Sequence, residues 1–269
     1  MEDKEKLVTY LASQVKGYGL GENHEKAIRE GIASGNDFEL SAQRKKLGEV
    51  SNARLYFRNS EAGTFFNSFK VSLLKPGSSY ERKRMFFIDN KPKAPGEFSS
   101  FHISFREAHN LLAGRSIPKE VIRNEQKDQV YLTLDFKKTD KHGNPDLTVQ
   151  YPEYGFKLSD VASRFNFAGP LADRESNEWQ AFAKGDLVEG RIMGADGKER
   201  EILASYNAMY KNITLYDSAQ VMIKREELVE KQYVKINQNM TESNSKQEVK
   251  KNELKDDNKT QRQRKNLKV

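Results

Sequence analysis

Near the start of the chain, apolar residues recur every three to four positions, a spacing typical of an amphipathic helix. In the segment 4–16 the residues on the apolar face are Leu7, Val8, Leu11 and Val15. Gly17 follows directly, and glycine readily adopts the backbone conformation that closes a helix. The pattern therefore predicts a leading helix that ends at Gly17.

Three later segments share one frame: a helix-forming run, a glycine, two variable positions and an apolar residue. The glycines are Gly35, Gly114 and Gly185, spaced 79 and 71 residues apart. Since each would supply a left-handed residue at a helix end, the frame predicts three helices that stop at these glycines. Internal repetition at such spacing suggests that one folding unit is used three times.

Residues that cap helices precede the same three segments. Ser104 followed by Glu107 has the spacing of a capping box, in which side chain and backbone satisfy each other's hydrogen bonds. Ser176 is predicted to cap the third helix and Asn23 the first.

Runs that alternate between apolar and polar residues follow each glycine. The runs are 53–58, 69–73, 84–89, 130–136, 147–151, 187–193, 201–207 and 212–217. Alternation with Gly, Asn and Asp between runs is typical of β-hairpins, and it predicts sheets with one buried and one exposed face.

The predicted fold is therefore α+β, with three repeated helix-plus-antiparallel-hairpin units behind the leading helix. The expected divisions are 1–95 (leading helix and first unit), 96–171 (second unit), 172–222 (third unit), 223–239 (short helical connector) and 240–269 (disordered basic tail). Whether the three sheets join into one stays open at this level.

Two sets of residues carry a resemblance to known proteins. The first set is 8–22, 107–114, 132–140 and 154–156, and the second is 183–185 with 196–198, Asn207 and 215–217. The first resembles an uncharacterised family of small bacterial proteins carried on conjugative transposons. The second is similar to a domain of unknown function that recurs in tandem in proteins of such elements. The resemblance covers about residues 7–220; it implies a setting of mobile DNA, conjugation or host interaction, and carries over no catalytic residue.

Charge is unevenly divided along the chain. The 269 residues hold 46 Lys and Arg against 39 Asp and Glu, a net charge of +7, of which residues 223–269 supply +5. No aromatic residue occurs from Met240 onward, so disorder is expected there. The basic end of this segment contains Arg262, Arg264 and Lys265. It is read as an arm that touches nucleic acid or an acidic partner, or alternatively as a solubilising tail.

Several classes of protein are excluded or disfavoured. The absence of cysteine excludes disulfide scaffolds and cysteine-based zinc sites. No apolar run reaches the roughly 18–20 residues of a membrane span, and the charged N-terminus lacks the core of a signal peptide. A cytoplasmic protein without membrane contact is expected.

Motifs for catalysis are missing as well. The four histidines, His24, His102, His109 and His142, show no metal-ligand spacing. Neither the glycines near Gly17 nor those near Gly194 fit a phosphate loop, and no nucleophile elbow occurs. We expect a non-catalytic protein with no cofactor and no metal; an enzyme whose site is assembled in space remains the alternative.

Cations interleaved with an aromatic residue provide the strongest functional signal. Arg54, Tyr56 and Arg58 share the outward face of one predicted strand, and the remaining candidates are Lys70, Arg84, Lys137, Lys138 and Lys141. Such side chains can pair with phosphates and stack on a base. They also keep exposed sheet faces soluble and protect strand edges.

The sequence therefore predicts an accessory protein of a mobile element that binds a macromolecule, with DNA or RNA as the first candidate. A protein-interaction adaptor or inhibitor acting on host or conjugation machinery is the alternative.

Overall fold

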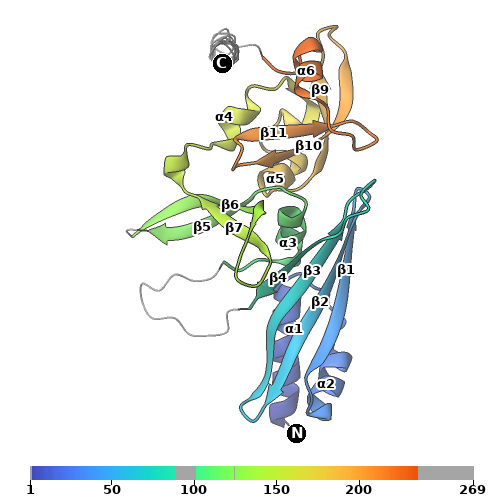
Figure 1. Cartoon of the computed structure of the whole chain (residues 1–269), viewed down its shortest axis with the longest axis vertical. Coiled ribbons are helices and arrows are strands. Elements are labelled where there is room, and N and C mark those ends of the chain that lie inside the picture. The colour runs from blue at the N-terminus through green and yellow to red at the C-terminus, as the bar shows by residue number, and fades with distance from the viewer. Residues whose placement is uncertain (1, 89–100, 124, 236–269) are drawn as a thin grey trace, which may run out of the picture.

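A computed structural model describes residues 2–88, 101–123 and 125–235 of the chain. The predicted tail 240–269, with Arg262, Arg264 and Lys265, lies outside these residues. The described chain is α+β and contains three separate antiparallel sheets, stacked along the long axis of the molecule (Figure 1).

The first sheet is a meander of four strands in the order β1-β2-β3-β4. Its strands are β1 (Phe38–Lys46), β2 (Glu49–Ser60), β3 (Gly63–Leu74) and β4 (Arg82–Phe87). Burial alternates along β2 and β3, so the sheet has an inner and an outer face. Helices α1 (Glu2–Gly17) and α2 (Glu25–Ser34) lie behind the inner face in Figure 1.

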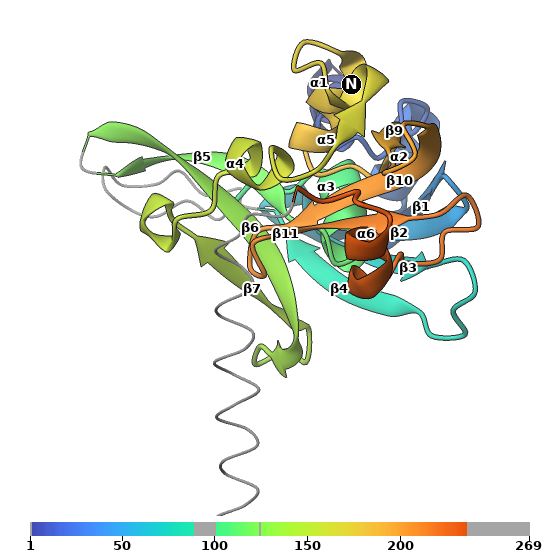
Figure 2. The ribbon, with the colours of Figure 1, turned by 90° about the horizontal axis from the view of Figure 1, so that it is seen from above.

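The second sheet shares its core with the first. It has the order β5-β6-β7, with β5 (Ile117–Arg123), β6 (Gln126–Thr139) and β7 (Pro145–Gln150), and helix α3 (Phe105–Leu112) precedes it. Leu132 and Leu134 of β6 join the core formed by α1, α3 and the first sheet, whereas Tyr131 joins the core of the third sheet. The far end of the β5–β6 hairpin projects sideways from the molecule in both views (Figures 1 and 2).

The third sheet has the order β11-β10-β9-β8, with β8 (Phe167–Ala168), β9 (Val188–Met193), β10 (Glu199–Asn207) and β11 (Asn212–Tyr216). The surrounding helices are η1 (Pro152–Tyr154), α4 (Leu158–Ala162), η2 (Gly169–Leu171), α5 (Asn177–Ala183) and α6 (Arg225–Glu230). Phe182 of α5 packs against Tyr206 in its core, and Trp179 packs against Phe182. Ser116 ties this sheet to the second, because its hydroxyl accepts from Ala208 N–H at 2.7 Å.

Several local predictions are confirmed. The leading helix ends at Gly17, and Gly35, Gly114 and Gly185 follow helices with positive φ values of 73°, 85° and 91°. Ser104 forms the full capping box with Glu107, and the Ser176 hydroxyl accepts from Trp179 N–H. The prediction for Asn23 is wrong: the residue at the α2 cap is His24, which makes no side-chain capping bond.

The structure does not confirm three repeats of one unit. The glycines mark helix ends, which is a local property, while the three sheets contain four, three and four strands in different arrangements with the helices. One-sided burial is also wrong for β6, where Tyr131 and Thr133 are buried together with Val130 and Leu132. Both faces of β6 are covered because it lies between the two cores.

None of the described helices combines the length and apolar character needed to cross a lipid bilayer.

Candidate nucleic-acid interface

The outer face of the first sheet carries the first group of predicted residues. Arg54, Tyr56 and Arg58 alternate with the buried Ala53, Leu55 and Phe57 along β2. Lys70 lies directly opposite Arg54 on β3 and is exposed as well. The structure therefore brings Arg54, Tyr56, Arg58 and Lys70 together, because all four point away from the helices that cover the inner face.

Cations outnumber carboxylates on this outer face. Its charged side chains, taken over the described residues, are five cations and two carboxylates: Lys45, Arg54, Arg58, Lys70 and Lys83, with Glu39 and Glu81. Arg54 pairs with Glu39 at 3.4 Å and Lys83 with Glu81 at 2.7 Å. Within the described chain, Arg58 and Lys70 form no ion pair within 4.0 Å; the charge of Lys70 acts on Glu81 only at longer range, where it helps to lower the pKa of that carboxyl.

Aromatic rings lie among these charges. Tyr56 and Phe87 flank Ser68 in one row across β2, β3 and β4, and Phe65 lies opposite Arg58 on β3. Phe65 is 40% exposed and Phe87 is 60% exposed, which is high for phenylalanine in a folded protein. The outer face thus offers aromatic surfaces as well as positive charge.

The turn between β6 and β7 borders this face at the β4 edge. Asn144 Oδ1 accepts from Met85 N–H at 3.0 Å, and the ring of His142 lies 5.8 Å from that of Phe87. Lys141, next to His142 in the chain, is exposed in this turn. Lys137 and Lys138 are exposed at the end of β6, where Lys138 is 3.9 Å from Asp135.

Arg84 does not belong to this face. It lies opposite Val71, whose side chain is buried, and therefore points inward; burial lowers its pKa, while Asp140 and Asp146 oppose that shift. Arg82, two residues earlier, also points inward and stacks 4.3 Å above the ring of Phe136. The candidate Arg84 therefore does not share a face with Arg54 and Lys70, because strand alternation separates them.

A buried polar cluster joins α3 to the inner face of β2. His109 lies between Ser51 and Glu49: the Ser51 hydroxyl is 2.5 Å from Nδ1, and Nε2 is 2.9 Å from Glu49 Oε2. Arg115 donates two hydrogen bonds to the Glu49 carboxylate, at 3.0 and 2.8 Å. Serine, histidine and glutamate in contact are the components of a nucleophilic triad. These three side chains are at most 2% exposed, so no substrate reaches the Ser51 hydroxyl in this conformation.

The surroundings of Glu49 and His109 determine the protonation state of each side chain. Burial would raise the pKa of Glu49, but the hydrogen bond from His109 and the Arg115 guanidinium outweigh it and hold the pKa at about 2. Burial lowers the pKa of His109 against the opposing effect of Glu49. Glu49 is therefore ionised and His109 neutral at pH 7, as expected for a polar core that orients two elements.

A second buried carboxylate, Asp186, continues the cluster to the third sheet. Arg106 binds it at 3.0 and 2.8 Å, Asn110 at 2.8 Å and Lys46 at 3.0 Å. Burial would raise the pKa of Asp186, but these donors hold it at about 2. Residues from all three predicted units thus meet in one network, and Arg106 and Arg115 are engaged inside it rather than free for phosphate.

The search for metal-binding groups and the comparisons with known proteins give no further information on this site. Within the ranges that the structure describes, no three His, Asp and Glu side chains are grouped to hold a metal ion. No family model, curated protein or solved structure matches the chain. The mobile-element setting therefore stays a prediction.

Proposed function

We propose that the protein binds single-stranded nucleic acid on the outer face of the sheet β1–β4. The observation that carries the proposal is that unpaired cations and exposed aromatic rings lie together on a sheet face that α1 and α2 leave open.

The charges suit a phosphate backbone. Arg58 and Lys70 have no carboxylate partner in the described chain, so binding phosphate requires no existing ion pair to break. The Arg54–Glu39 pair is exposed on both sides, with 66% and 50% of the side chains accessible, and such pairs contribute at most about 1 kcal/mol. A phosphate can therefore replace Glu39 at little cost.

The aromatic rings favour an unpaired strand over a duplex. Stacking of a base on an aromatic side chain contributes about 1–3 kcal/mol and needs bases that are free of their complement. Tyr56 and Phe87 lie two strands apart in one row, about 10 Å between backbones at the usual strand spacing. Two separated bases of an extended strand can use rings at that distance, while Arg54 and Lys70 in the adjacent outward row contact phosphates.

Binding of fluorescein-labelled oligonucleotides, measured by fluorescence anisotropy at 50 mM salt, tests the proposal. The probes are dT15, rU15 and a 15-base-pair duplex. We expect both single strands to bind more tightly than the duplex. The double variant Arg58→Gln/Lys70→Gln should lower the affinity for the single strands about tenfold or more. Phe87→Ala should weaken the free energy of single-strand binding by about 1–3 kcal/mol.

The matched control is Lys157→Gln/Lys184→Gln. These two exposed lysines lie outside the sheet face, and the double change removes the same charge. If both double variants lose the same affinity, binding is non-specific and the proposed face is wrong. Absence of oligonucleotide binding together with capture of an acidic protein by the Arg58 and Lys70 face would also overturn the proposal, in favour of a protein partner.

A further inference from the structure

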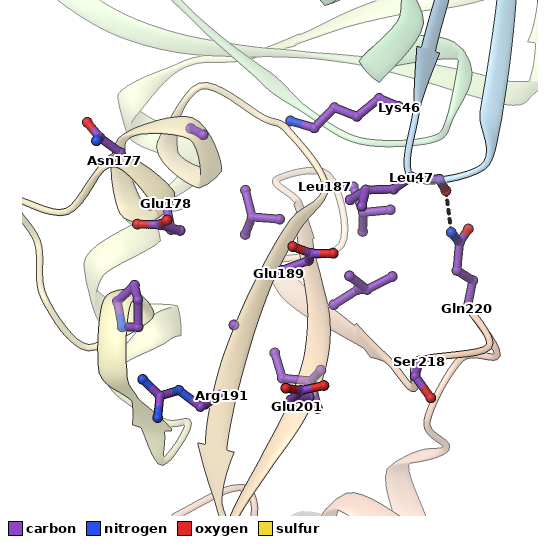
Figure 3. A pocket seen from close by; sticks show the side chains of 16 residues that line it. Lys46, Leu47, Asn177, Glu178, Leu187, Glu189, Arg191, Glu201, Ser218 and Gln220 are labelled. Atoms are coloured by element: carbon purple, nitrogen blue, oxygen red, sulfur yellow. Dashed lines mark hydrogen bonds between the residues drawn. The ribbon is translucent and has the colours of Figure 1, made fainter.

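A cleft of about 730 Å³ lies on the third sheet, away from the proposed nucleic-acid face. Its sides are formed by the tip of the β1–β2 hairpin, by η2 and α5, and by β9 and β10 (Figure 3). The apolar part of its lining comes chiefly from Leu47, Pro170, Leu187, Val188, Ile202 and Leu203.

Three carboxylates line the cleft without a cation of their own. Glu178, Glu189 and Glu201 are exposed and form no ion pair within 4.0 Å in the described chain. Figure 3 shows them around the open space, with Lys46 at one end and Arg191 at the other.

Each of the two cations of the lining already has a carboxylate partner. Lys46 pairs with Asp186 at 3.0 Å, and Arg191 pairs with Glu199 at 2.7 Å. The cleft therefore presents negative charge above an apolar floor, and the complementary ligand is a cationic segment with occasional apolar side chains.

The chain itself contains such a segment. Residues 259–268 carry five cations and no carboxylate: Lys259, Arg262, Arg264, Lys265 and Lys268. Leu267 and Val269 supply apolar groups at its end.

The segment can reach the cleft. The last described residues are tied to the far end of β9, because Asn166 N–H donates to Tyr233 O, and Met193 N–H donates to Asn166 O. The cleft runs along β9 from Leu187 to Arg191, so its near and far ends lie two and six residues from Met193, about 7 and 20 Å at the usual rise per residue. A linker of 23 residues, the number between Lys235 and Lys259, can span about 25–30 Å by the end-to-end relation for a random coil, which is enough.

We infer that residues 259–268 bind in this cleft of the same chain, with their cations on Glu178, Glu189 and Glu201. A linker of this length gives an effective concentration of about 1 mM, so an intrinsic Kd near 0.25 mM already protects the segment about fivefold. The inference is independent of nucleic-acid binding, which concerns another face.

Two measurements on the full chain test the inference. In the first, limited trypsin digestion follows cleavage after Arg262, Arg264 and Lys265. We expect cleavage of the unaltered chain to be about fivefold slower than cleavage of Glu178→Gln/Glu189→Gln/Glu201→Gln. The matched control, Glu175→Gln/Glu226→Gln/Glu230→Gln, changes exposed carboxylates outside the cleft and is expected to stay as slow as the unaltered chain.

In the second, a carbodiimide joins lysines to carboxylates that touch them, and an equal mixture of ¹⁴N- and ¹⁵N-labelled chains separates links within one chain from links between chains. We expect Lys259, Lys265 and Lys268 to link to the cleft glutamates within one chain. Equal cleavage in all variants, links spread evenly over other carboxylates, or links mainly between chains would each overturn the inference.

Discussion

Replacing Glu49 by glutamine tests the buried cluster most sharply. The change keeps the size of the side chain, removes its charge and replaces one acceptor oxygen by an NH2 donor. Arg115, 4% exposed and bonded to both Glu49 oxygens, is then left as a buried guanidinium without its counter-ion. Its Nε has no hydrogen-bond partner in the described chain, and its bond to Asn110 Oδ1 at 3.0 Å is to a neutral amide, so neither replaces the lost negative charge.

The expected loss is about 3–5 kcal/mol of unfolding free energy, the usual effect of removing one partner of a buried ion pair. The pKa of Glu49 gives a consistent figure. Holding a carboxyl at about 2 instead of its ordinary 4.5 corresponds to about 3 kcal/mol, at 1.36 kcal/mol per pKa unit. Because the folded pKa is depressed, this stability is complete above pH 4.5 and is lost as pH falls from 4.5 towards 2.

Urea unfolding at pH 7 and at steps down to pH 3, followed by far-UV circular dichroism, measures both effects. Glu49→Gln is expected to be less stable at pH 7 and to lose less stability below pH 4.5 than the unaltered chain. Glu39→Gln on the neighbouring strand, where the carboxylate is 50% exposed, is the control and should change stability by less than about 0.5 kcal/mol. A Glu49→Gln protein within about 1 kcal/mol of the unaltered chain, with the same acid profile, would show that the charge of Glu49 does not stabilise the cluster.

Other features of the structure give three further predictions. Gly185→Ala should lower the free energy of unfolding by more than about 2 kcal/mol, because a Cβ there would lie 2.2 Å from the Ser116 carbonyl oxygen. At Gly197 a Cβ would meet nothing within 4 Å, so Gly197→Ala should lower it only by the strain of the positive φ, about 1 kcal/mol. Thermal unfolding compares the two variants, and equal losses of stability would contradict the steric explanation for Gly185. Ser104→Ala should cost about 1 kcal/mol through loss of the capping box, and an unchanged melting temperature would count against it. His109 should titrate below its ordinary 6.5, so that its contribution to stability is complete above pH 6.5 and falls below that pH; an NMR titration with a midpoint at or above 6.5 would show that the ring is not held neutral.

Local features of the fold are predictable from the sequence because their causes are local. Helix ends at Gly35, Gly114 and Gly185 need only a residue that accepts positive φ, and Ser104 needs only Glu107 three positions later. How the sheets pack on one another depends on which of their faces become covered. Alternation of apolar and polar residues therefore predicts an exposed face for β6 that is in fact buried. Its polar-looking face is buried by a sheet formed about 60 residues later in the chain.

The cations and the tyrosine of the proposed interface on β2 can be predicted from the sequence, but two of its phenylalanines are not among the predicted residues. Alternation placed Arg54, Tyr56 and Arg58 correctly, whereas Phe65 and Phe87 were missed. Each belongs to a Phe-Phe pair within a strand, and neighbouring strand residues point to opposite faces. One ring of each pair therefore lies on the outer face of the sheet.

The buried cluster left a fainter signal. Arg106, His109 and Asn110 have the spacing of one helix face, and that face is polar on a helix that is otherwise buried. Their partners, Glu49 and Asp186, lie 60 and 76 residues away from His109 and Asn110 along the chain, and no local pattern connects them.

The salt dependence of single-strand binding shows whether cations of the outer face of β1–β4 bind the phosphates of a nucleic acid. Displacement of counterions by about five cations predicts a slope of log K against log salt near −3.5 for dT15, and Arg58→Gln/Lys70→Gln should reduce its magnitude by about 1.4. Lys157→Gln/Lys184→Gln should leave the slope unchanged. No binding at 50 mM salt, or one slope shared by all three proteins, would contradict nucleic-acid binding by this sheet.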